Sequence, residues 1–164
     1  MINNMTDSAY SDILIPTDGS DLAQRALEEA LTIAGLTDAT IHVLFVVDDA
    51  KIAELASECG MDTVTFDADV DALFERYEAL GEHALEDLQD AATNQGVEVT
   101  AGIRKGLPRD EILAYVDEND IGLIVMATHG RQGLERYVLG STTEAVLRRA
   151  SVPVLAVHGD STDE

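Results

Sequence analysis

A glycine-rich segment between residues 127 and 144 is the part of the sequence best suited to hold an anion. Gly130, Gly133 and Gly140 punctuate this segment, and Ser141 follows directly. Glycine has no Cβ, so the backbone N–H groups beside it can approach a ligand closely. Gly140 and Ser141 also begin a predicted helix, whose free N–H groups and dipole favour negative charge. The segment therefore predicts a phosphate-binding loop that is closed by a helix N-terminus.

The same residues also fit a structure without a ligand. Ser141 and Glu144 have the S-x-x-E spacing of a capping box, in which each side chain binds the backbone N–H of the other residue. Gly130 and Gly133 would then only turn a surface loop. The two interpretations are compatible, because a capped helix still presents N–H groups of its first turn to a ligand. The sequence leaves both open.

Net charge restricts the partners of the protein. The 164 residues include 32 Asp and Glu against 10 Lys and Arg, which gives a net charge of −22 and a pI of about 4.2. Such an acidic surface is repelled by the phosphates of nucleic acids and by anionic membranes. We therefore expect no nucleic-acid partner and no membrane partner. The longest apolar run, residues 121–127, is also too short to span a bilayer.

The charge is unevenly distributed along the chain. Residues 48–90 contain 14 acidic and 2 basic side chains, net −12, whereas residues 127–152 contain 2 acidic and 4 basic ones, net +2. Arg148 and Arg149 suit the negative end of the dipole of their own predicted helix. Arg131 lacks that explanation. A locally basic stretch in an acidic protein favours a small anionic ligand over an extended polyanion.

Composition also indicates the compartment. Cys59 is the single cysteine, so no intrachain disulfide can form, and the polar N-terminus lacks the basic start and apolar stretch of a secretory signal. Both features fit a cytoplasmic location. Acidic excess with two lysines, Lys51 and Lys105, is typical of a halophilic protein, because molar salt shortens the Debye length to about 3 Å. An ordinary acidic protein is the alternative.

Apolar periodicity predicts alternating strands and helices in one domain, residues 12–158, with disordered tails at 1–11 and 159–164. Such alternation is typical of a parallel sheet covered on both faces, so we predict a doubly wound α/β fold of five strands. The predicted strands are residues 13–15, 40–47, 97–103, 121–128 and 153–158. The predicted helices are residues 21–34, capped by Gly35, then 70–91, 108–119 and 141–150. Residues 48–68 are predicted as an irregular loop with room for one short helical turn.

Ligands of such folds bind beyond the carboxyl ends of the strands. The segments that follow the predicted strands are residues 16–20, 48–49, 104–109 and 127–141. The chain lacks the G-x-x-x-x-G-K-[ST] motif of P-loop enzymes, and its four histidines show no metal-ligand spacing. His42 falls within a predicted strand, where a histidine is more typical of core or sheet surface than of a ligand.

Two segments of the chain resemble the universal stress protein family. They are ILIPTDGSDLAQRAL near the start and MATHGRQGLERYVLGSTTEAVLRRASVPVLAV near the end, and the resemblance extends from about Asp12 to His158. The nucleotide-binding members carry the pattern G-x2-G-x9-G-[ST]. Here Gly130, Gly140 and Ser141 match three of its four elements, and Ala127 replaces the first glycine.

The resemblance implies a parallel sheet of strand order 3-2-1-4-5 and ATP, with Mg²⁺ or Mn²⁺ bridging its phosphates, at the point where the strand order reverses. Asp18 would contact the ribose or adenine, and Ile41 would meet the adenine through its backbone. Glycines and hydroxyl residues of the glycine-rich segment would hold the phosphates. The full set of implied binding residues is Pro16, Thr17, Asp18, Ile41, Met126, Ala127, His129, Gly130, Arg131, Gly133, Gly140, Ser141, Thr142 and Thr143.

The function implied by this resemblance is that of a nucleotide-dependent sensor or switch in the stress response. Family members commonly pair as homodimers through the last strand, here residues 153–158. No residue has an expected catalytic role, and any ATP hydrolysis would be slow. A nucleotide-free dimeric interaction module of the same fold is one alternative. A weak ATPase or an adenylyl-transfer enzyme is the other.

Overall fold

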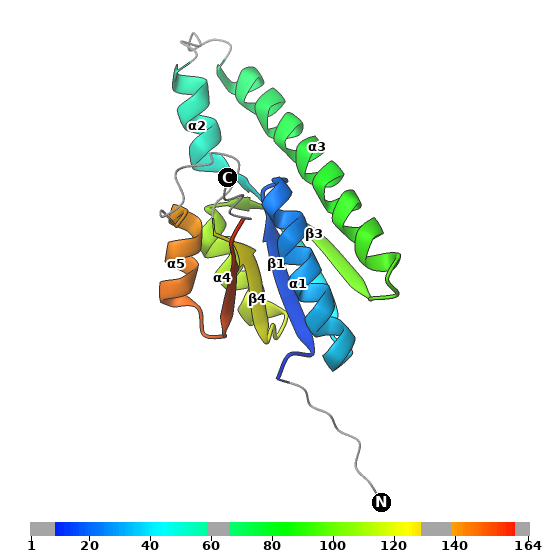
Figure 1. Cartoon of the computed structure of the whole chain (residues 1–164). Helices are drawn as coiled ribbons and strands as arrows, with labels where there is room; N and C mark the ends of the chain where they lie inside the picture. Colours follow the sequence, from blue (N-terminus) through cyan, green and yellow to red (C-terminus); the bar gives the residue numbers. More distant parts are fainter. Residues whose placement is uncertain (1–8, 59–65, 129–138, 160–164) are drawn as a thin grey trace, which may run out of the picture.

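The computed structural model describes residues 9–58, 66–128 and 139–159, without the side chains of residues 66–69. Most of the two predicted tails lies outside these ranges. Residues 9–11 belong to the domain, because the Thr40 N–H donates to the Ser11 carbonyl at 2.9 Å. The elements, shown in Figure 1, are β1 (Asp12–Thr17), α1 (Asp21–Thr37), β2 (Thr40–Asp48), α2 (Asp49–Glu58), α3 (Phe66–Thr93), β3 (Val99–Gly106), α4 (Pro108–Glu118), β4 (Leu123–Ala127), α5 (Ser141–Arg149) and β5 (Val154–Val157).

The five strands form one parallel sheet in the order β3-β2-β1-β4-β5. This confirms the predicted fold class and strand order. The order reverses beside β1, which pairs with β2 on one side and with β4 on the other. Carboxyl ends of β1, β2 and β4 therefore lie next to one another at one edge of the sheet, which is where such folds bind ligands.

Helices cover both faces of the sheet, because alternate strand residues point to opposite sides. Ile13 and Ile15 pack into a core with α1 and α3, whereas Leu14 packs into a second core with α4 and α5. All three of these side chains are fully buried. Strands that are apolar on both faces are typical of parallel sheets. In Figure 1, α2 and the first turns of α3 extend beyond the carboxyl edge.

The predicted loop at residues 48–68 is wrong. It contains helix α2, which follows β2 without an intervening residue, and the beginning of α3. Asp48 acts as the cap of α2, because its Oδ1 accepts the Lys51 N–H at 3.1 Å. Ile52 and Ala56 are the two buried residues of this helix, too few to give a clear helical period in a sequence rich in acids.

Most element ends also differ from prediction by a few residues, as α1 and β3 show. Helix α1 continues through Gly35 to Thr37, and Asp38 ends it in the left-handed conformation with φ of 54°. Strand β3 is shifted toward the C-terminus, to Val99–Gly106 instead of 97–103. Its last residues pair with the end of β2, and Val97 instead donates its N–H to Ala92 at the end of α3. The bounds of β3 are therefore set by its pairing with β2, which the local sequence pattern does not show.

A buried polar network fastens α4 to the sheet. The Asp12 carboxylate lies 3.0 Å from His42 Nε2, and the Tyr115 hydroxyl lies 3.0 Å from His42 Nδ1. A carboxylate only accepts hydrogen bonds, so His42 Nε2 donates to Asp12, and Nδ1 forms the hydrogen bond with the Tyr115 hydroxyl. Arg104 lies over the Tyr115 ring, 4.9 Å from its centroid, and pairs with Glu118. His42 is thus a partnered core residue, as predicted.

Replacing Tyr115 by phenylalanine is expected to cost about 1–2 kcal/mol of unfolding free energy, because buried His42 loses a partner. Burial raises the pKa of Tyr115 above its usual value of 10.0, while Arg104 acts in the opposite direction. A raised folded-state pKa stabilises the fold below about pH 10, and that contribution is lost as pH rises through the folded-state value. Urea unfolding of both proteins from pH 7 to pH 11 should show that the difference in their unfolding free energies becomes smaller above pH 10. A difference that stays constant would contradict the role assigned to the Tyr115 hydroxyl.

Candidate functional site

A pocket of about 630 Å³ lies at the carboxyl edge of the sheet, where the strand order reverses. This volume is typical of a site for a small organic ligand. Its walls come from the ends of β1, β2 and β4 and from the helices around them. The lining residues are Pro16, Thr17, Asp18, Ala23, Leu44, Phe45, Val46, Asp48, Lys51, Tyr77, Leu80, Pro108, Ile112, Met126, Ala127, Leu139, Gly140, Ser141, Thr142, Thr143 and Glu144.

Most of the predicted binding residues meet in this pocket, although they come from three distant parts of the sequence. They are Pro16, Thr17, Asp18, Met126, Ala127, Gly140, Ser141, Thr142 and Thr143. Four more predicted residues, His129, Gly130, Arg131 and Gly133, lie outside the described residues.

Ile41 does not belong with this set, and its predicted role is corrected. It is the second residue of β2, so it lies toward the amino end of the strand, away from the carboxyl edge. Its side chain is fully buried, and its N–H donates to the Glu98 carbonyl at 2.9 Å. The β2 residues that line the pocket are Leu44, Phe45, Val46 and Asp48.

The turn after β1 brings a carboxylate to the pocket. Thr17 Oγ1 accepts the Gly19 N–H at 3.0 Å, and Asp18 Oδ1 accepts the Ser20 N–H at 3.0 Å. Gly19 has a φ of 77°, which is a conformation that glycine adopts without steric cost. These bonds hold the exposed Asp18 side chain at the pocket wall, just before α1 begins.

The start of α5 presents its backbone to the pocket. Gly140 is the N-cap and provides no side-chain hydrogen bond, while its own N–H donates to the Thr128 carbonyl at 2.8 Å. The Glu144 N–H is the one that reaches back to the Gly140 carbonyl, at 2.9 Å. Ser141, Thr142 and Thr143 precede it, so their N–H groups have no carbonyl within the helix to bind.

The capping-box interpretation is wrong in this structure. Ser141 is the first helical residue and not the cap. The Glu144 carboxylate binds Arg148 at 2.8 Å, one turn further along the helix. Thr143 donates its hydroxyl proton to the Ala127 carbonyl at 2.9 Å, which ties the helix start to the end of β4. The start of this turn is therefore tied to β4, and among the described residues no side chain caps its amide groups.

Ala127 fits its position without backbone strain. It is the last residue of β4 and pairs with Val157 of β5. Among the residues described, the non-glycine ones with positive φ are Asp38 and Asp120. Ala127 therefore keeps ordinary strand geometry, and the methyl group that replaces the expected glycine hydrogen costs nothing in conformation.

Several pocket residues were not predicted from sequence. Lys51 comes from α2, and Tyr77 and Leu80 come from α3. The first of these carried a detectable signal, since Lys51 is one of two lysines in the chain and lies in its most acidic stretch. The others belong to apolar helix patterns that do not show which end of a helix approaches a ligand.

The charged groups that line the pocket are the carboxylates of Asp18, Asp48 and Glu144 and the ammonium group of Lys51. Within the described ranges, no three His, Cys, Asp or Glu side chains are grouped so that they could hold a metal ion. Nor do those ranges contain a helix both long enough and apolar enough to cross a membrane.

Comparison with known proteins connects this architecture to a family. A model of the universal stress protein family matches residues 9–158, nearly the whole chain. The chain belongs to the universal stress protein family. A relative in the same family, universal stress protein MJ0531 of Methanocaldococcus jannaschii, is 34% identical over 151 residues, which cover 92% of this chain and 84% of the relative.

Solved structures agree with this assignment. Protein MJ0577 of Methanocaldococcus jannaschii superposes on this universal stress protein with a TM-score of 0.79 at 25% identity, over 94% of this chain and 99% of that one. Universal stress protein UspA from Lactobacillus plantarum gives a TM-score of 0.77 at 29% identity, over 90% and 97% of the two chains. The Rossmann-like fold of this universal stress protein is therefore that of its family.

Proposed function

We propose that this protein binds ATP, with Mg²⁺ or Mn²⁺, in the pocket at the carboxyl edge of the sheet. The observation that carries the proposal is the start of α5, where Gly140 gives no side-chain cap and the first three helical residues, Ser141–Thr143, line the pocket. A helix N-terminus attracts phosphate through its free N–H groups and its dipole together. Thr143 and Gly140 are both tied to the end of β4, so these donors need little reorganisation to bind a ligand.

The remaining walls suit the rest of a nucleotide. Leu44, Val46 and Met126 provide apolar surface for a flat base. The Asp18 carboxylate accepts hydrogen bonds and is suited to the hydroxyl groups of a ribose. Phosphate oxygens and water would supply ligands to the bound Mg²⁺ or Mn²⁺, as is common for metal ions that accompany nucleotides.

Proteins of this fold accept adenine nucleotides. One universal stress protein has been solved in complex with cAMP, at 24% identity to this chain, and one from Arabidopsis thaliana has been solved with AMP bound, at 20% identity. Similarity at this level establishes the shared fold, and the ligand of this chain is inferred from its own pocket.

The proposed role is that of a sensor or switch in the cytoplasm of a salt-adapted cell, with at most slow ATP hydrolysis. A bound nucleotide would change the position of the start of α2 and the start of α5, because residues of both helices line the pocket.

We also propose a homodimer through residues 153–158. Strand β5 is an edge strand with one unpaired side, and the Leu155 side chain is exposed there. An edge with free backbone groups can pair with a second copy.

Equilibrium binding tests the proposal. Calorimetric titration of the full chain with ATP and Mg²⁺, in low salt and in molar KCl, is expected to give saturable binding at one site per chain. Nucleotide released from the freshly purified protein by acid and identified by mass spectrometry would give the same answer independently. Absence of affinity at both salt concentrations would reject ATP binding and favour the nucleotide-free interaction module.

A further inference from the structure

A lysine on α2 lines the proposed nucleotide pocket. Lys51 is the one cationic side chain among the described pocket residues, where it accompanies the carboxylates of Asp18, Asp48 and Glu144. Phosphate groups placed near these three carboxylates would be repelled unless a positive charge offset them. A cationic side chain close by would therefore favour phosphate binding in this pocket, in addition to the metal ion bound with the nucleotide.

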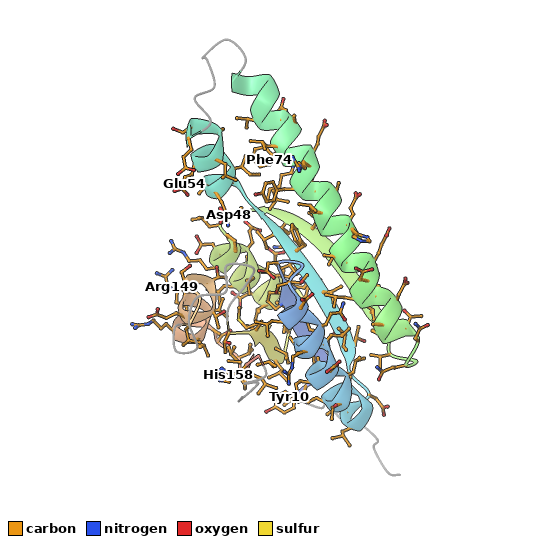
Figure 2. The ribbon with its side chains drawn as sticks, turned by 45° about the horizontal axis from the view of Figure 1, so that its top comes forward. Tyr10, Asp48, Glu54, Phe74, Arg149 and His158 are labelled. Carbon is orange, nitrogen blue, oxygen red and sulfur yellow. The ribbon has the colours of Figure 1, made fainter. Side chains whose placement is uncertain are left out.

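Helix α2 holds the backbone of Lys51 in a defined place. Asp48 ends β2 and caps α2 through its bond to the Lys51 N–H, so sheet and helix are joined directly (Figure 2). Ile52, the next residue, is 1% exposed, and Ala56 is fully buried one turn later. The apolar side of α2 is thus anchored in the core, and Lys51 is left at the pocket wall.

The side chain of Lys51 has no carboxylate partner within the part of the chain that the structure describes. The other lysine differs in this respect, because Lys105 lies 3.1 Å from Glu78 and packs over the Phe74 ring. In a protein with 32 acidic residues, an ammonium group at a pocket wall with no such partner is available to an anionic ligand.

We propose that Lys51 binds the phosphate groups of the nucleotide and makes the pocket selective for phosphorylated ligands over the nucleoside. The proposal rests on the nucleotide site described above and goes beyond it by naming a residue of α2 as the selectivity determinant. Amide groups at the start of α5 would bind the phosphate oxygens from one element, and the Lys51 ammonium group would bind them from another. Binding would then also fix α2 to the pocket.

The test compares ATP and adenosine binding in three variants, by calorimetry at one KCl concentration. Lys51→Gln removes the charge and keeps most of the side chain, and it is expected to weaken ATP binding about tenfold with adenosine affinity unchanged within about twofold. Lys51→Arg should retain ATP affinity within about threefold, since it keeps the charge. Lys105→Gln changes net charge equally outside the pocket and is expected to leave both ligands unaffected.

Each outcome decides the proposal. It fails if Lys51→Gln binds ATP as the wild type does, if ATP and adenosine lose affinity together, if Lys51→Arg loses as much as Lys51→Gln, or if Lys105→Gln has the same effect. A wild type that binds neither ligand would overturn the proposed function and this inference together. A wild type that binds ATP beside a Lys51→Gln variant of equal affinity would overturn this inference alone.

Discussion

Replacement of Gly140 by valine is expected to weaken ATP binding about tenfold to a hundredfold. Gly140 is the N-cap of α5 and lines the pocket, so a branched side chain there would occupy the space in front of the helix amides. Overpacking of this kind costs about 1–3 kcal/mol, and every 1.4 kcal/mol is about tenfold in affinity. Calorimetric titration with ATP and Mg²⁺ measures the change.

The fold itself should tolerate this substitution. Gly140 has a φ of −59°, which every residue adopts, so valine causes no backbone strain. Loss of a good N-cap residue costs about 1 kcal/mol at most. Gly35→Val provides the matched control, because a Cβ at Gly35 of α1 would meet nothing within 4 Å. If Gly140→Val binds ATP as well as Gly35→Val does, the start of α5 is not where the phosphates bind.

Alanine at Gly81 and alanine at Gly35 are expected to have opposite effects on stability. Both glycines lie inside helices, where alanine normally stabilises by about 0.5–1 kcal/mol. At Gly81 the new Cβ would lie 2.5 Å from Phe45 Cδ1, so the buried Phe45 ring must move. Overpacking costs about 1–3 kcal/mol, and the helix gain is common to both variants, so they should differ by about 1–3 kcal/mol in unfolding free energy.

Urea unfolding of both variants checks this expectation, with the slope of each transition as a control on two-state behaviour. Because Phe45 also lines the pocket, displacement of its ring in Gly81→Ala should reduce ATP affinity as well. Gly35→Ala should leave the affinity unchanged. Equal unfolding free energies for the two variants would show that α3 does not press on Phe45 as closely as the structure has it.

Sequence patterns predicted the long elements well, for a physical reason. Strands such as β4 are apolar on both faces, and helices such as α1 repeat their buried residues at helical spacing. The order of apolar residues along the chain therefore indicates which residues are buried. Helix α2 was not predicted at its full length, because only two of its residues are buried and its cap, Asp48, is also the last residue of β2. Two buried positions are too few to give a helical period in the sequence.

The same distinction applies to the site. The segment that ends in Gly140 could be predicted as an anion-binding segment from residue types, because glycine lets backbone N–H groups approach a phosphate. The role of Asp18 came from the family resemblance. The role of Ile41 came from the family resemblance and was misplaced. The strand pattern could not correct it, because burial does not show which end of a strand meets the pocket. Only the pairing register of β2 revealed that Val46 lies at that edge.

The sequence by itself therefore determined the fold class of this protein, a parallel α/β sheet, and its strongly acidic composition. Tertiary structure alone showed that a side chain at Gly81 would be crowded while one at Gly35 would not. It also showed that Gly140 caps α5 and that Lys51 lines the pocket. Local preferences act within a few residues and can be summed along the chain. Crowding, capping and pocket membership arise between residues that are distant in sequence, and they exist only once the sheet has brought the ends of its strands together.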